Sequence, residues 1–148
     1  MANNGKGVIF TSRCSSPAVE GVALQTGLLP GMAVEQAATG FNKYANDGST
    51  DGLQCLIVDK NFLKGGSLVT DAYAQLDTVV ARQLAKGETA NVLVSAGNNI
   101  TKRGMPITTD SADGYCQIAT PATETVRFYS DEIINVTGSA ALVRVVGA

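Results

Sequence analysis

The sequence contains no histidine and no tryptophan among its 148 residues. Without histidine the chain lacks the usual general base of enzymes, the Ser-His-Asp and Cys-His arrangements, and the commonest ligand of transition metals. Cys14, Cys55 and Cys116 are far apart and form no C-x-x-C pair, so they predict no structural zinc site. We therefore expect no enzyme activity, no metal and no cofactor, and we expect reduced cysteines that pack as small hydrophobic side chains.

Charge is also scarce. Asp, Glu, Lys and Arg make up 16% of the chain, against roughly a quarter in typical soluble domains. A surface with so little charge is typical of a protein that sister subunits or a larger assembly cover. The net charge is -2, and the 11 basic residues form no cluster that would hold a phosphate backbone, so we expect no nucleic-acid partner.

The sequence has no apolar run long enough to span a membrane, and its beginning, "MANNGKGVIF", does not have the pattern of a signal peptide. We therefore expect no membrane partner. The chain length fits one domain of ordinary size, and 45% of the residues are apolar, which favours a globular fold.

Short β patterns separated by glycine-rich turns dominate the chain from Val19 onward. They predict a mainly β fold, a small β-barrel or sandwich-like domain with one or two short helices. The stretch "LLPGMAVE" at 28–35 places a Pro-Gly turn before a strand at 32–35. The overlapping stretch "PGMAVEQAATGF" at 30–41, which could hold one helical turn before Gly40, and "VTDAYAQL" at 69–76 are the two candidate helical segments. The run "LQCLIVD" at 53–59 is nearly continuous in apolar residues, which indicates a strand buried on both faces.

Two pairs of strands joined by short turns are predicted from turn chemistry. Residues 77–84 and 89–95 flank the tight turn Lys86-Gly87-Glu88, which indicates a β-hairpin. Near the end of the chain, two strands are expected on either side of Thr137-Gly138-Ser139.

The first 17 residues differ from the rest, because they are rich in Gly, Asn and Ser and end at a proline. We expect residues 1–17 to form a flexible arm and residues 18–148 to form a single barrel-like domain. The apolar residues Val8, Ile9 and Phe10, with Arg13, are the candidate contacts of this arm with a partner.

The stretch "DGSTDG" at 47–52 has the spacing of the first half of an EF-hand loop, with Asp47, Ser49, Asp51 and Gly52 at suitable positions. The twelfth position, which needs a bidentate Glu, is Val58, and a β run begins where a helix should begin. Asn, Asp, Gly and Ser are also the residues that turns prefer, so we interpret the stretch as a surface connection, with a weak ion site as the alternative.

Several motifs occur together in a characteristic order between residues 28 and 115. They are a Pro-Gly-Met turn at 30–32, a Tyr-to-Asp segment at 73–77, the Lys-Gly-Glu turn at 86–88, an Asn-Ile-x-x-x-Gly turn at 99–104 and an Asp-Gly turn at 113–114. In this order and spacing the chain resembles the head decoration, or capsid cement, proteins of tailed bacteriophages.

The resemblance implies a non-enzymatic protein of the virion, made in the cytoplasm of a bacterial host and bound to the outer surface of the capsid. Such proteins bridge neighbouring major capsid protein subunits, often as homotrimers, and their N-terminal arm commonly orders against the shell. The alternative is a receptor- or glycan-binding β-module of a virion or cell-surface fibre. That alternative predicts exposed aromatic side chains, and the chain has only four Phe and four Tyr.

Overall fold

The computed structural model describes residues 6–45, 54–62, 69–110 and 114–148. The described residues fold into short strands joined by turns, so the mainly β prediction is confirmed. Their strands are β1 (Val19–Val22), β2 (Ala33–Ala37), β3 (Gly40–Lys43), β4 (Leu56–Val58), β5 (Thr78–Arg82), β6 (Thr89–Val94), β7 (Asn98–Ile100), β8 (Pro106–Thr109), β9 (Cys116–Ile118), β10 (Phe128–Ser130), β11 (Ile134–Val136) and β12 (Ala141–Gly147).

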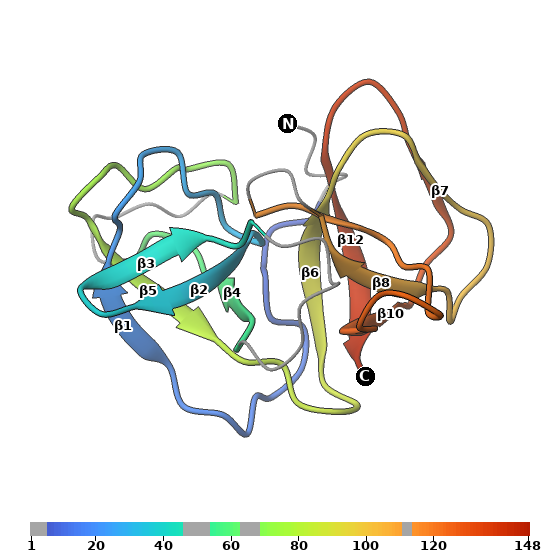
Figure 1. Cartoon of the computed structure of the whole chain (residues 1–148), viewed down its shortest axis with the longest axis horizontal. Coiled ribbons are helices and arrows are strands. Elements are labelled where there is room, and N and C mark those ends of the chain that lie inside the picture. Colours follow the sequence, from blue (N-terminus) through green and yellow to red (C-terminus); the bar gives the residue numbers. More distant parts are fainter. Residues whose placement is uncertain (1–5, 46–53, 63–68, 111–113) are drawn as a thin grey trace.

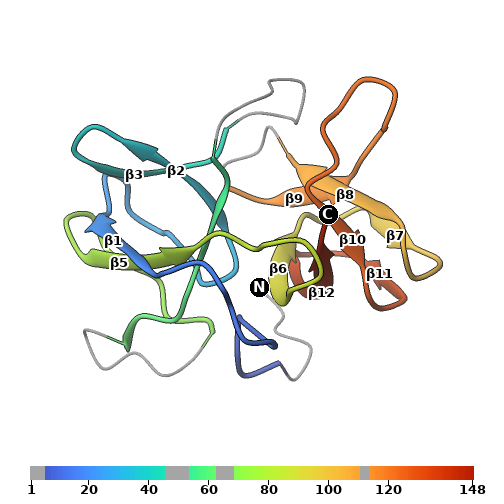
Figure 2. The same cartoon turned by 90° about the horizontal axis from the view of Figure 1, so that it is seen from below.

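The strands gather into two bodies that lie side by side (Figure 1). One is a five-stranded sheet with the order β1-β5-β4-β2-β3, which we call the first lobe. The other is a closed barrel with the order β10-β12-β6-β9-β8, which confirms the predicted barrel. A separate two-stranded ribbon pairs β11 with β7 at the side of the barrel (Figure 2).

The first lobe curls until its two edges meet at one point. Ala23, just after β1, forms a parallel bridge with Phe41 of β3, and the Leu24 N–H donates to the Phe41 carbonyl at 3.0 Å. Its hydrophobic core includes Phe41, Leu28 and Tyr73, all essentially buried. The lobe is therefore almost a second barrel, in which the edge strands β1 and β3 meet only at the end near Ala23 and Phe41.

The barrel is built on the pairing of β12 with β6, in which Leu142 faces Leu93 and Val143 faces Val92 across antiparallel strands. The only parallel pairing among the described strands joins β6 to β9 through Val94 and Cys116. The core of the barrel is the larger of the two hydrophobic clusters, and it also takes in residues from the first lobe.

Strand β4 lies between the two cores, which are the hydrophobic clusters of the first lobe and of the barrel. Leu56 and Val58 belong to the core of the first lobe, and Ile57 between them belongs to the core of the barrel. Successive side chains of a strand point to opposite faces, so one short strand serves both cores. The sequence prediction of a strand buried on both faces is confirmed.

The predicted hairpin at 77–95 is wrong. β5 pairs with β1 and β4 in the first lobe, whereas β6 pairs with β12 and β9 in the barrel. The Lys86-Gly87-Glu88 turn therefore carries the chain from one body to the other, and its backbone bonds to the last strand instead: the Gly87 N–H donates to the Gly147 carbonyl at 3.1 Å.

The two candidate helical segments need correction. Residues 33–37 form β2, and residues 70–76 form turns around a bridge at Tyr73, so neither predicted helix exists in these segments. The two strands predicted on either side of Thr137-Gly138-Ser139 are confirmed as β11 and β12, and each of them pairs with other strands. β11 pairs with β7, and β12 pairs with β6 and β10.

Candidate functional site

Three segments that are far apart in the sequence bond to one edge of β6. Along this edge, three successive outward N–H groups donate to carbonyls of three different segments: Asn91 to Ile9 at 2.6 Å, Leu93 to Gly31 at 2.9 Å, and Ser95 to Cys116 at 2.9 Å. The N-terminal segment, the Pro-Gly turn and β9 thus complete the same edge. Unpaired backbone groups are costly when buried, so all three segments stabilise β6.

The first lobe contacts the barrel at a place that we call the lobe joint, which is formed by Gly31, Gly114, Tyr44 and Arg127. The Pro30-Gly31 turn is its first contact. The Gly31 N–H donates to the Val58 carbonyl of β4 at 2.8 Å, while the Gly31 carbonyl accepts from β6. Gly31 has a φ of 87°, and a Cβ there would lie 2.6 Å from Cδ2 of the buried Leu142. Only glycine fits this position without strain.

Gly114 is the second contact of the lobe joint. Its carbonyl accepts from the Ala33 N–H of β2 at 2.8 Å, and its N–H donates to the Tyr44 carbonyl at 2.8 Å. Its φ is 86°, and a Cβ would lie 3.0 Å from the Ala33 carbonyl oxygen. Gly31 and Gly114 therefore both hold the first lobe against the barrel.

A buried tyrosine and a half-buried arginine reinforce the lobe joint. An Arg127 Nη atom donates to the Tyr44 hydroxyl at 2.7 Å, and the guanidinium lies 5.1 Å from the centre of the tyrosine ring. Tyr44 follows β3 in the first lobe, and Arg127 precedes β10 in the barrel. A cation against an aromatic face is attractive, and more so when water is excluded.

The described part of the predicted arm, residues 6–17, is held against the barrel. Residues 9–11 run antiparallel to the start of β6, with a bridge between Phe10 and Ala90. Ile9 is 1% exposed and belongs to the barrel core, and the side chain of Asn91 donates to the Val8 carbonyl at 2.7 Å. Burial in the barrel core favours this placement of Ile9 over exposure to water. The flexibility of the arm at 1–17 stays a prediction.

Side chains fasten the same segment at both of its ends. Lys6 forms an ion pair with Glu132 at 2.9 Å. Further along, the Ser15 N–H donates to the Glu88 carboxylate at 2.5 Å, and the Ala85 N–H donates to its other oxygen at 3.0 Å. These backbone donors favour the charged form, so they lower the pKa of Glu88.

The four candidate contact residues of the arm therefore differ in what they offer a partner. Ile9 is buried and Phe10 is half-buried against the barrel core, whereas Val8 is 48% exposed and Arg13 is exposed. Contact between these residues and a partner stays a prediction.

All three cysteines are free thiols. Cys55 and Cys116 are buried in the barrel core, where burial raises the pKa of Cys55 to about 11 and raises that of Cys116 well above its ordinary value. Thiols of this kind remain protonated and unreactive at neutral pH.

The candidate calcium stretch at 47–52 lies outside the described residues. Val58, at the position where a calcium loop needs a Glu, is fully buried in β4. Within the described ranges, no three His, Cys, Asp or Glu side chains come together in a group that would hold a metal ion.

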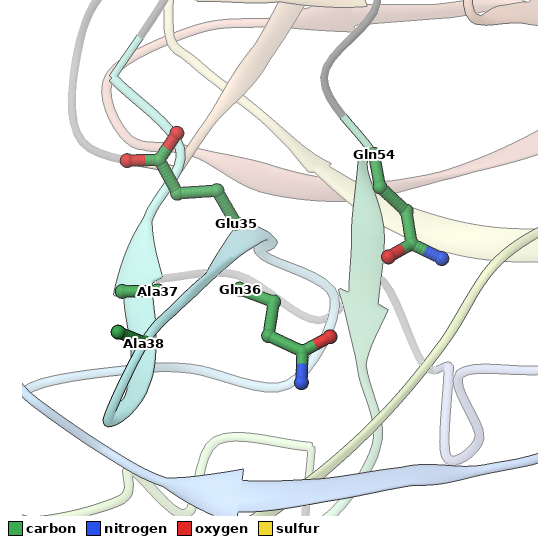
Figure 3. A pocket seen from close by; sticks show the side chains of 5 residues that line it. All are labelled: Glu35, Gln36, Ala37, Ala38 and Gln54. Carbon is green, nitrogen blue, oxygen red and sulfur yellow. The ribbon is translucent and has the colours of Figure 1, made fainter.

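A hollow on the described surface lies beside the hairpin of β2 and β3 and the start of β4 (Figure 3). It has a volume of about 510 Å³ and is lined by Glu35, Gln36, Ala37, Ala38 and Gln54. Its side chains are small or polar, and it contains a single ionisable group and no aromatic ring. Such a lining offers neither a nucleophile with its base nor a stacking surface for a sugar.

Other exposed apolar side chains were not predicted from the sequence. Those with large side chains, besides Val8, are Phe62, Leu76, Tyr129 and Ile133. The sequence gives no signal for them, because their exposure depends on the register of strands and on turns that bring distant segments together.

No protein-family model matches the sequence, and no curated protein matches it. Within the described residues, no helix is long and apolar enough to cross a membrane.

Proposed function

We propose that the chain is a non-enzymatic structural protein that binds the outer surface of a phage capsid and stabilises it by bridging neighbouring major capsid protein subunits. In this proposal the protein acts on the expanded shell of the virion and does so as a homotrimer. It needs no cofactor.

The observation that carries the proposal is the ordered series of turn motifs between residues 28 and 115. Two of these motifs, Pro30-Gly31 and Gly114, have glycines with positive φ that hold the first lobe against the barrel. The residues that resemble decoration proteins are thus residues that fix the shape of the molecule. A protein that works by shape alone needs such rigidity, because ordering a loose surface on binding costs free energy.

The surface supports the proposal in a second way. Large apolar side chains such as Ile133, 66% exposed, and Tyr129, 43% exposed, remain in water on a chain that carries little charge. Exposed apolar side chains that gather in a patch are typical of surfaces that a partner covers.

Trimer formation would amplify a modest contact. Once one subunit of a trimer binds the shell, the other two are held near their own sites, so avidity rises by roughly 10² to 10⁴ without new contacts. A protein of 148 residues can therefore hold firmly to the shell through three small interfaces.

The test is co-sedimentation of the purified protein with expanded, empty heads of the phage that encodes it, beside native mass spectrometry of the protein alone. We expect saturable binding to expanded heads, weaker binding to unexpanded heads, and a trimeric mass. A monomer that stays in the supernatant with both kinds of head would contradict the proposal.

The alternative, a receptor- or glycan-binding module, predicts exposed aromatic side chains, and among the described residues Phe62 and Tyr129 are 55% and 43% exposed. Neither of them lines the hollow. The hollow of Figure 3 has no aromatic ring against which a sugar could stack. Binding to a glycan array, with no binding to heads, would favour this alternative.

A further inference from the structure

Three neighbouring strands of the barrel carry a row of apolar side chains on their outer face. Tyr129 of β10 lies directly opposite Pro106 of β8 on one side and Val146 of β12 on the other. Directly paired residues point to the same face of a sheet. Phe128 and Val145 point into the core, so the row faces outward, and Tyr129 at its middle is 43% exposed.

A basic turn stands at one end of this row. Lys102 and Arg103 come shortly before β8 and are both exposed. We call Lys102, Arg103, Pro106, Tyr129 and Val146 together the cationic face.

The basic turn is held rigidly. Ser130, 3% exposed, accepts the Gly104 N–H on its carbonyl at 2.7 Å. Its hydroxyl donates to the Lys102 carbonyl at 3.0 Å and accepts the Met105 N–H at 3.0 Å. Because the buried serine makes three hydrogen bonds to this turn, the backbone of the turn is fixed. The backbone that carries Lys102 and Arg103 therefore needs little further ordering when a partner binds.

The acidic residues nearby are already paired with other cations. Asp131 accepts from Arg144 Nε at 2.8 Å, and Glu132 pairs with Lys6 at 2.9 Å. Neither Lys102 nor Arg103 forms an ion pair or a side-chain hydrogen bond with any described residue. The cationic face therefore keeps two unneutralised positive charges on a protein whose net charge is -2.

We propose that the cationic face is the surface that binds the capsid, and that it fits an acidic region of the shell with an apolar centre. This inference rests on the proposed function and adds the contact surface and its chemistry. Tyrosine and arginine are enriched among the residues that dominate protein interfaces. A fixed pair of cations beside an apolar row complements a surface with negative charge around apolar groups, and it also speeds encounter with that surface.

The experiment compares charge-reversed variants for binding to expanded heads of the encoding phage. Lys102→Glu with Arg103→Glu is expected to weaken binding by about tenfold or more, since each reversal replaces an attraction with a repulsion. Tyr129→Ser is expected to weaken it by a similar factor. Added salt is expected to weaken the wild type more than the double variant, because salt screens the charges that the variant lacks.

Lys102→Glu and Arg103→Glu are also made singly, with Lys86→Glu as the matched control for each, because Lys86 is also exposed but lies outside the cationic face. We expect it to change binding by less than about twofold. Thermal unfolding of every variant shows whether the fold is intact, and Leu76→Ala serves as the apolar control for Tyr129→Ser.

The possible outcomes separate the two proposals. If the wild type binds heads and the double variant binds equally well, the cationic face is not the contact, and the proposed function stands. If the wild type does not bind heads, both proposals fail. If the wild type binds duplex DNA and the double variant does not, the face serves a nucleic acid and the inference is overturned.

Discussion

The first lobe and the barrel contain five strands each, yet they differ in how they are closed. The barrel is closed by strand pairing all the way round, whereas the first lobe meets at one bridge between Ala23 and Phe41. The barrel core also takes in Ile57 and Met32 from the first lobe and Ile9 from the N-terminal segment. We infer that the barrel is the stable unit, and that the first lobe and the N-terminal segment depend on it.

The largest expected effect comes from a leucine-to-alanine change in each core. Leu142 and Leu56 are both fully buried, the first in the barrel and the second in the first lobe. Each change should cost about 2–5 kcal/mol of unfolding free energy through lost burial and the cavity left behind. Hydrogen exchange should show that Leu142→Ala loosens both bodies, whereas Leu56→Ala loosens β1–β5 alone. If each change loosened the first lobe and the barrel equally, the inference that the first lobe depends on the barrel would be contradicted.

Two glycine substitutions test the lobe joint. Gly31 and Gly87 have nearly the same φ, 87° and 84°, but a Cβ at Gly87 would meet nothing within 4 Å. Gly87→Ala should cost about 1 kcal/mol for backbone strain alone. Gly31→Ala should cost about 3 kcal/mol, because overpacking against Leu142 adds to the same strain. Urea unfolding measures both, and equal costs would mean that the turn is not tightly packed at the joint.

Neighbouring residues of the N-terminal segment test whether it belongs to the barrel. Ile9→Ala should lower the unfolding free energy by about 2 kcal/mol, since Ile9 is 1% exposed. Val8→Ala, at a position 48% exposed, should change it by less than about 0.5 kcal/mol. Thermal unfolding distinguishes these results from those of a free arm, for which both changes would be neutral.

A change in the first lobe should increase stability. Leu76 is the only residue other than glycine with positive φ among those described, at 71°, and its side chain is 74% exposed. Leu76→Gly relieves the strain and gives up almost no burial, so we expect up to about 1 kcal/mol of stabilisation, reduced by the entropy of glycine in the unfolded chain. A lower melting temperature for this variant, with Gln75→Gly as the control, would show that Leu76 packs within the lobe.

The smallest expected effect concerns Glu88, which bonds both the N-terminal segment and the crossing between the two bodies. Its pKa is lower in the folded protein than the ordinary value of 4.5, because the Ser15 and Ala85 N–H groups favour the carboxylate. The stability from these bonds is therefore fully present above pH 4.5 and is lost as the pH falls through the folded pKa. Glu88→Gln should be less stable than the wild type at neutral pH. The melting temperatures of the two proteins should converge as the pH falls below the folded pKa of Glu88.

The sequence predicted features that depend on neighbouring residues. It predicted the mainly β fold, the barrel and the burial of β4 on both faces, because strand periodicity and turn chemistry are local. It placed glycine turns at Gly31 and Gly114, but not their role in joining two bodies. Their hydrogen-bond partners, Val58 and Tyr44, are far from them in the sequence.

The wrong predictions failed for a related reason. A tight turn at Lys86-Gly87-Glu88 looks the same whether its flanking strands pair with each other or leave for different sheets. The sequence could not predict the cationic face, because Tyr129, Pro106 and Val146 become neighbours only through the register of three strands. Long-range pairing decides both cases, and it leaves little trace in a local pattern.

The most direct test of the proposed function is the temperature at which DNA-filled heads of the encoding phage release their DNA. Heads that lack the protein are compared with the same heads after saturation with the purified wild type. If the protein stabilises the shell by bridging its subunits, saturated heads should release DNA at a clearly higher temperature. Equal release temperatures with the protein bound, or no binding at all, would contradict the account.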